Sequence, residues 1–256
     1  MLSVRRFGRG PTLVALHGFS MTGDQFRELA RPLGHAILAP DLPGHGRSAH
    51  EDCAIDEVID EVAALLPDAP IAPLLGYSQG ARVALLVAHA RPASIESLVL
   101  VSGNAGVRDP AERERRIAED DARAERILSS PLDDFIDEWT AQPLTSTERW
   151  SESDQDADRQ MRQQNTTRGL ARALRGYGQG VQPNLWPELG TMTVPTLVVT
   201  GEFDAKYTAI GEALTAALPT AEMVVVEGAG HNVLGDEPER AARAIRSFLE
   251  RNRRAT

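Results

Sequence analysis

The pentapeptide Gly76-Tyr77-Ser78-Gln79-Gly80 places a serine between glycines two residues to either side. It follows an apolar run, residues 71–75, and it opens a helical pattern over residues 79–90. A sharp strand-to-helix turn of this kind exposes the serine hydroxyl, and the glycines let neighbouring backbone pass closely. The positive end of the helix dipole lies behind the serine. The pattern predicts a reactive Ser78.

A serine hydroxyl reacts only when a base takes its proton, and that base needs a third group to orient it. Asp204 and His231 each follow an apolar, strand-like run further along the chain. Both therefore lie on loops at the carboxyl ends of strands, where open parallel sheets bind their ligands. The order Ser78, Asp204, His231 predicts a catalytic triad, with Glu202 as the alternative orienting acid.

The five other histidines have different expected roles. His17-Gly18-Phe19 follows the first strand, and a backbone N–H there, with the N–H of Gln79, would form an oxyanion hole. His45 is expected in a loop that shapes the site. No catalytic role is expected for the remaining three, which are His35, His50 and His89.

Short apolar runs alternate with helical patterns through the first third of the chain. The expected strands are 12–16, 36–39, 71–75 and 97–101, and the expected helices are 24–33, 55–66 and 79–90. The alternation resumes later, with strands 196–200 and 222–226 and helices 207–218 and 237–251. This pattern predicts an α/β fold with a mostly parallel sheet that helices cover on both faces.

The segment between these two parts is different. From about residue 107 to residue 181 the pattern is charged and helical, and no run resembles a strand. We therefore expect a helical cap, residues 107–182, inserted into a core made of residues 1–106 and 183–256.

Composition and charge exclude several classes of protein. The 256 residues, 42% hydrophobic and 25% charged, are typical of a globular protein, and the formal charge of −10 argues against general nucleic-acid binding. A single cysteine, Cys53, excludes an internal disulfide and a multi-thiolate metal site. No signal peptide or membrane span is predicted. We expect a cytoplasmic protein that needs neither a metal nor an organic cofactor.

Taken together, His17-Gly18, residues 41–48 and the three triad residues resemble the α/β-hydrolase superfamily over nearly the whole chain. A narrower resemblance rests on Arg82, four residues after Ser78, and on three segments, which are residues 139–144, 174–183 and 201–206. These features are similar to the 2-succinyl-6-hydroxy-2,4-cyclohexadiene-1-carboxylate synthases of menaquinone biosynthesis.

That resemblance implies a carbon–oxygen lyase. The enzyme would eliminate pyruvate from 2-succinyl-5-enolpyruvyl-6-hydroxy-3-cyclohexene-1-carboxylate by removing a proton next to the succinyl ketone. Ser78, activated by His231, would take the proton, and the N–H groups of Phe19 and Gln79 would face the enolate oxygen. A small substrate with several carboxylates is the expected partner.

The same resemblance implies which residues bind that substrate. Arg82, Arg116 and Arg162 would bind its three carboxylates, because a guanidinium matches a carboxylate in shape and charge. Tyr77 and Trp139 would line the same pocket.

Two positions depart from the family pattern. Ala81 stands where the family usually has a second glycine, and Leu234-Gly235-Asp236 stands where it tends to have another His and Glu. A serine hydrolase of a small ester, lactone or carbon–carbon bond would use the same triad and is the alternative enzyme. A non-catalytic binding module with the same fold is the alternative from another class.

Overall fold

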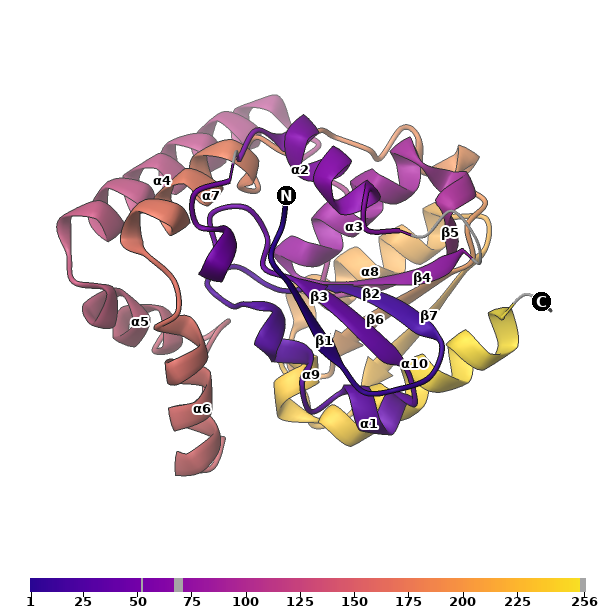
Figure 1. The fold of residues 1–256 in the computed structure, drawn as a ribbon. Helices are drawn as coiled ribbons and strands as arrows, with labels where there is room; N and C mark the ends of the chain where they lie inside the picture. Colours follow the sequence, from indigo (N-terminus) through magenta and orange to yellow (C-terminus); the bar gives the residue numbers. More distant parts are fainter. Residues whose placement is uncertain (52, 67–70, 254–256) are drawn as a thin grey trace.

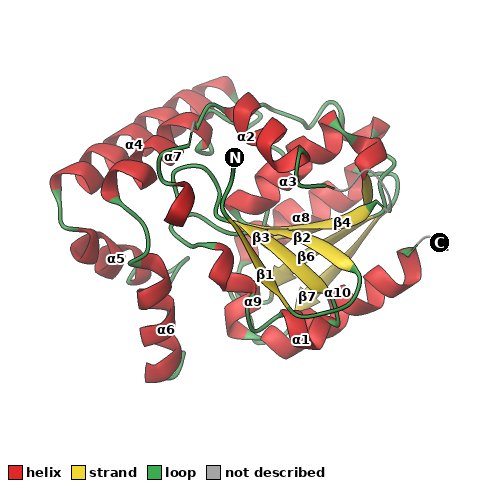
Figure 2. Cartoon of the chain, in the orientation of Figure 1, coloured by secondary structure: helices red, strands yellow, loops and turns green. Residues whose placement is uncertain are grey.

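The computed structural model describes residues 1–51, 53–66 and 71–253. Among these residues, seven strands form one sheet in the order β1-β3-β2-β4-β5-β6-β7, drawn in yellow in Figure 2. They are β1 (Val4–Phe7), β2 (Thr12–Leu16), β3 (Ala36–Pro40), β4 (Ala72–Tyr77), β5 (Ile95–Val101), β6 (Thr196–Gly201) and β7 (Ala221–Val226). Every pairing is parallel except that of β1 with β3. The predicted α/β fold with a mostly parallel sheet is confirmed.

Helices cover both faces of the sheet (Figure 1). One buried cluster joins the sheet to α2 (Ile55–Ala63), α3 (Gln79–Ala90) and α8 (Ala205–Ala217). A second cluster joins the opposite face to α1 (Ala30–Leu33) and α10 (Pro238–Asn252). The central strands β2, β4, β5 and β6 are almost entirely buried, which is why they are apolar on both sides.

The expected helix 24–33 is wrong. The chain instead forms a 3₁₀ turn, Gly23–Phe26, and then the single-turn helix α1. Pro32 explains the break, because it has no N–H to donate to the carbonyl four residues earlier and its ring crowds that carbonyl.

Four α-helices lie between β5 and β6 in the described chain: α4 (Pro110–Ser129), α5 (Leu132–Thr140), α6 (Glu152–Arg162) and α7 (Thr167–Tyr177). They lie together to one side of the sheet (Figure 1). Side chains of α4, α5 and α7 form a buried cluster separate from the two on the sheet, and Phe19 of the core packs against it. No helix in the described part of the chain is long and apolar enough to cross a membrane.

A buried carboxylate joins β1 to two loops at the end of the sheet. Asp41, fully buried after β3, accepts from Arg5 Nε at 3.0 Å and from Arg5 Nη2 at 3.1 Å. It also accepts from the backbone N–H of Gly23 at 2.9 Å and of Arg47 at 3.0 Å. Burial alone would raise the pKa of Asp41, but these hydrogen bonds outweigh burial and hold the pKa below its usual value.

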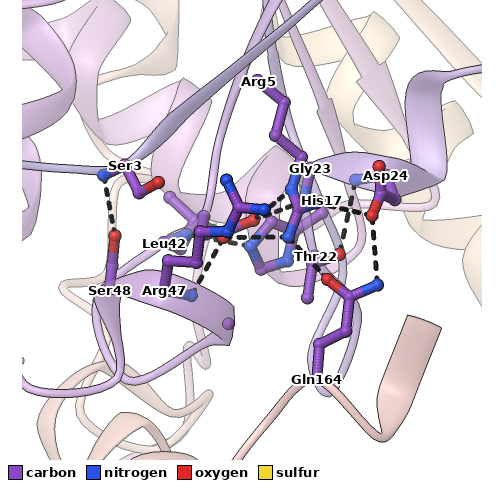
Figure 3. Close-up of polar contacts among 12 residues, drawn as sticks. Ser3, Arg5, His17, Thr22, Gly23, Asp24, Leu42, Arg47, Ser48 and Gln164 are labelled. Carbon is purple, nitrogen blue, oxygen red and sulfur yellow. Dashed lines mark hydrogen bonds and ion pairs between the residues drawn. The ribbon is translucent and has the colours of Figure 1, made fainter. Parts of the chain in front are cut away.

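Arg5 also reaches the inserted helices (Figure 3). It donates to Asp24 at 2.6 Å and to the side-chain oxygen of Gln164, just after α6, at 2.6 Å. Gln164 in turn donates to Asp24 at 3.1 Å. The edge strand thus delivers one guanidinium that connects the core loops with the insertion.

Two fully buried histidines support the same loops. His17 Nε2 accepts from the N–H of Leu42 at 2.9 Å, and His45 Nε2 accepts from the N–H of Ser20 at 3.3 Å. The other ring nitrogen of each lies beside a backbone carbonyl, so each ring is neutral, with one donor and one acceptor. Burial lowers the pKa of His17 to about 4 and that of His45 to about 3.

Replacing Arg5 with alanine should lower the free energy of unfolding by about 3–5 kcal/mol, because it leaves the buried Asp41 carboxylate without its cation. Urea unfolding measures this loss. The matched control is Arg6→Ala, at the neighbouring exposed position of the same strand, where a change below about 0.5 kcal/mol is expected. Equal effects of the two substitutions would contradict the role assigned to Asp41.

The buried histidines should make the protein less stable in mild acid. Below about pH 6.5 these histidines bind protons in the unfolded chain but not yet in the folded one. Each histidine therefore lowers the free energy of unfolding by about 1.4 kcal/mol for every unit by which the pH falls. This loss continues down to the folded pKa values, about 4 for His17 and about 3 for His45. Urea unfolding of His45→Gln between pH 7 and 5 should show a shallower dependence, whereas the exposed His50→Gln should match the parent chain.

Candidate active site

Ser78 occupies the sharp turn between β4 and α3. Its φ of +51° lies in the left-handed region, which is unusual for a residue with a side chain. The two flanking glycines are required by space, since a Cβ on Gly76 would lie 2.3 Å from the carbonyl oxygen of Gly80. A Cβ on Gly80 would lie 2.1 Å from the carbonyl oxygen of Leu16 in β2. The turn predicted from the pentapeptide therefore forms, and the close backbone contacts at Gly76 and Gly80 hold Ser78 in this strained conformation.

Ala81, the first departure from the family pattern, is accommodated by a glycine elsewhere. Its side chain is buried and faces Gly103, where an added Cβ would lie only 2.7 Å from the Ala81 Cβ. The methyl group therefore fits because the facing residue has none.

The three residues of the predicted triad lie in hydrogen-bond contact. His231 Nε2 is 3.1 Å from Ser78 Oγ, and His231 Nδ1 is 2.6 Å from Asp204 Oδ2. The other oxygen of Asp204 accepts the N–H of Tyr207 at 3.1 Å and so caps α8, which fixes the carboxylate. Glu202 is exposed and accepts from the N–H of Gly228 instead, so it is not the acid beside His231.

The two residues expected to supply the amides of the oxyanion hole, Phe19 and Gln79, line the same cavity as Ser78. Gln79 is the first residue of α3, where an N–H has no partner within the helix. Phe19 precedes Ser20, a non-glycine residue whose φ is +63°. Ser20 is held by all three of its polar groups, because Arg162 donates to its Oγ, Asn165 donates to its carbonyl, and its N–H donates to His45.

A cavity between the sheet and the inserted helices contains nearly all of the predicted site residues. Those that line it are Phe19, Tyr77, Ser78, Gln79, Arg82, Arg116, Trp139, Arg162 and His231. Asp204 is buried behind the His231 ring and does not line it. His35, His50 and His89 are also not among its lining residues.

Arg82 contributes a partly buried cation to this cavity without an acidic partner among the described residues. Its guanidinium donates to two neutral oxygens, the carbonyl of Tyr177 at 3.2 Å and Oε1 of Gln182 at 3.2 Å. Burial lowers the pKa of Arg82, as expected for a positive charge removed from water. An anion in the cavity would relieve that cost.

Two further arginines share one carboxylate. Asp120 of α4 lies 3.4 Å from Arg116 Nε and 3.5 Å from a terminal nitrogen of Arg123, and its side chain is buried. Its other oxygen accepts the N–H of Gly180 at 3.4 Å. Arg116 also lies 3.6 Å from the exposed carboxylate of Glu119, so Asp120 is the buried one of the two carboxylates that face these two guanidiniums.

Arg162 is the most completely bound of the lining arginines. Asp158, one turn earlier in α6, accepts from its Nε at 2.6 Å and from its Nη2 at 3.1 Å. With the hydrogen bond to Ser20, this places a buried, compensated guanidinium beside the loop that carries Phe19.

Sequence reasoning missed Arg123 and Asp120. Both line the cavity, and the Arg123 guanidinium lies 5.4 Å from the centre of the Trp139 ring. A signal was available, because Arg116, Asp120 and Arg123 are spaced four and three residues apart, which places them on one face of a helix.

Comparisons with known proteins agree with the resemblance that the sequence motifs indicate. The model of the alpha/beta hydrolase family matches residues 13–244. The 2-succinyl-6-hydroxy-2,4-cyclohexadiene-1-carboxylate synthase of Serratia proteamaculans (strain 568) is 34% identical over 244 residues, which cover 93% of each chain. A synthase described as putative, from Bacillus subtilis (strain 168), is 31% identical over 93% of this chain and 89% of its own.

Two solved structures extend the comparison. MenH from S. aureus superposes with a TM-score of 0.92 at 28% identity, covering 98% of this chain and 99% of its own. A malate-bound thermophilic esterase from Thermogutta terrifontis gives a TM-score of 0.84 at 26% identity, covering 98% and 93%. The resemblance predicted from the motifs is confirmed, and the chain belongs to the alpha/beta hydrolase family.

Proposed function

We propose that the protein is a lyase that eliminates pyruvate from 2-succinyl-5-enolpyruvyl-6-hydroxy-3-cyclohexene-1-carboxylate. The observation that carries this proposal is the charge of the cavity beside Ser78. Four arginines line it, and Asp120 is the one carboxylate among its described lining residues. A substrate with several carboxylates would compensate these charges, and the similarity to the synthases supports this substrate class.

The chemistry begins with the three side chains in contact. His231 Nε2 accepts the proton of Ser78 Oγ, and Asp204 stabilises the positive charge that develops on the imidazole. The serine oxygen then removes the proton next to the succinyl ketone, which leaves an enolate. The N–H groups of Phe19 and Gln79 donate to the enolate oxygen.

The second half of the reaction needs no further group from the protein. The enolate electrons move through the ring double bond and break the bond between the ring carbon and the enolpyruvyl oxygen. A second ring double bond forms, and the leaving enolate takes up a proton and becomes pyruvate. Two protons balance the cycle, one removed from the ring and one returned to the product.

The arginines orient the substrate for this step. Arg82 and the pair Arg116 and Arg123 are proposed to bind carboxylates directly. Arg82 has no acidic partner among the described residues, and Arg116 and Arg123 share the buried Asp120, while the second carboxylate beside Arg116, Glu119, is exposed. Arg162 retains N–H groups beyond those given to Asp158 and Ser20, and we assign it the third carboxylate. Tyr77 and Trp139 provide apolar walls. We further assign residues 107–182 as the cap that closes this pocket over a core of residues 1–106 and 183–256.

A serine esterase is the second candidate, and the similarity to the Thermogutta terrifontis esterase favours it. In that reaction Ser78 would displace the protonated alcohol from the ester and form an acyl-enzyme, and water would then release the acid. The two candidates share the triad and differ in their need for the arginines.

Ser78→Ala should reduce kcat for pyruvate release about a thousandfold or more, because the group that removes the proton is lost. The serine hydroxyl contributes little to packing, so the thermal unfolding midpoint should stay within about 2 °C of the parent value. A lactate dehydrogenase-coupled assay on the enolpyruvyl substrate measures the rate. Activity close to that of the parent chain would rule out Ser78 as the base.

Arg82→Gln, Arg116→Gln and Arg123→Gln should each lower kcat/KM for pyruvate release about ten- to hundredfold, the value of one charge-assisted hydrogen bond. The matched control is Arg126→Gln, an exposed position one turn beyond Arg123 in α4, where no change is expected.

Hydrolysis of the neutral ester p-nitrophenyl acetate, measured on the same variants, separates the lyase from the esterase. This ester has no carboxylate for an arginine to bind, so its rate of hydrolysis should be the same in the three variants as in the parent chain. Equal losses toward both substrates would show that these arginines support the structure, and unchanged pyruvate release in all three would contradict the lyase.

A further inference from the structure

The turn between α5 and α6 contacts the loop that carries His231. Trp150 lies in this turn, and its indole N–H donates to Asp236 Oδ1 at 2.7 Å. The indole ring also occupies the space beside Gly235, since a Cβ there would lie 2.3 Å from a ring carbon. Both partners belong to α9 (Val233–Asp236), the short turn that follows His231.

Asp236 transmits this contact to the catalytic loop. Its second oxygen accepts the backbone N–H of Gly230, the residue before His231, at 2.7 Å. Its side chain is 8% exposed, and Arg149 lies 3.4 Å from the same oxygen. One carboxylate therefore joins the insertion to the backbone N–H of the residue before His231.

The backbone on the other side of the imidazole is fixed as well. The carbonyl of His231 accepts from Ser102 Oγ, which is buried, at 2.8 Å. Asp236 and Ser102 thus hold the backbone on the two sides of the His231 ring. Of these two anchors, only Asp236 depends on a residue of the inserted helical region.

We propose that Trp150 is a positioning residue for His231, acting through Asp236 and made possible by Gly235. The proposal rests on the triad of the proposed function but not on the identity of the substrate. It gives a role to Leu234-Gly235-Asp236, the second departure from the family pattern. Gly235 leaves room for the indole, and Asp236 accepts its N–H.

The reaction of Ser78 with diisopropyl fluorophosphate tests the proposal without any assumption about substrate. The serine oxygen bonds to phosphorus, fluoride leaves, and the serine proton passes to His231, so the rate reports how well the imidazole is placed. Trp150→Phe keeps an aromatic ring but removes the indole N–H donor, and it should slow the reaction about three- to tenfold. Gly235→Ala, which displaces the ring, should slow it about tenfold or more.

Trp186→Phe is the matched control, because its indole N–H also donates to an oxygen, the carbonyl of Gly106 at 2.9 Å, but far from His231 in the chain. Its rate should stay within about twofold of the parent rate. The double variant of Trp150→Phe and Gly235→Ala should react no more slowly than Gly235→Ala alone, since both changes break one contact.

Four outcomes would overturn the proposal. Parent-like rates in both variants, or additive losses in the double variant, would show that the contact does not act on His231. A lower thermal unfolding midpoint with unchanged Ser78 reactivity would assign Trp150 a structural role only. A parent chain that does not react with diisopropyl fluorophosphate would overturn the triad, and the positioning role with it. A parent chain that reacts but releases no pyruvate would contradict only the lyase and leave the positioning role intact.

Discussion

The ion pair and hydrogen bonds of the buried Asp41 carboxylate are the interactions on which the loops of the candidate active site depend. A buried negative charge is tolerated only when its hydrogen bonds and a cation compensate the lost hydration. Arg5 supplies the cation, and the N–H groups of Gly23 and Arg47 supply the rest. The antiparallel edge strand β1 therefore positions Arg5 beside the loops that follow β2 and β3.

Local sequence patterns account for most of the fold but not for its edge. Buried parallel strands are continuous apolar runs, and six of the strands could be predicted from them. Val4–Phe7 has two arginines among four residues, so nothing in its own pattern marks it as a strand. The break in the expected helix 24–33 follows from Pro32, whose effect on a helix can be read from the sequence.

The site divides in the same way. Ser78, Asp204 and His231 were predictable because the carboxyl ends of parallel strands meet at one edge, so position along the chain gives position in space. The arginines followed only from the family resemblance, since no strand end places them. Trp150 and Asp236 are joined across a long stretch of chain, and no local pattern links an indole to a carboxylate at that separation.

The facing residues Ala81 and Gly103 show how the sizes of two side chains together determine how closely two backbone segments can pack. The space between them holds one methyl group, and in this chain that methyl belongs to the helix after Ser78 rather than to the loop after β5. The constraint therefore acts on the combined volume of a pair and not on either residue alone. A motif written for single positions records Ala81 as a mismatch, whereas a description of paired volumes accounts for its methyl group through the facing Gly103.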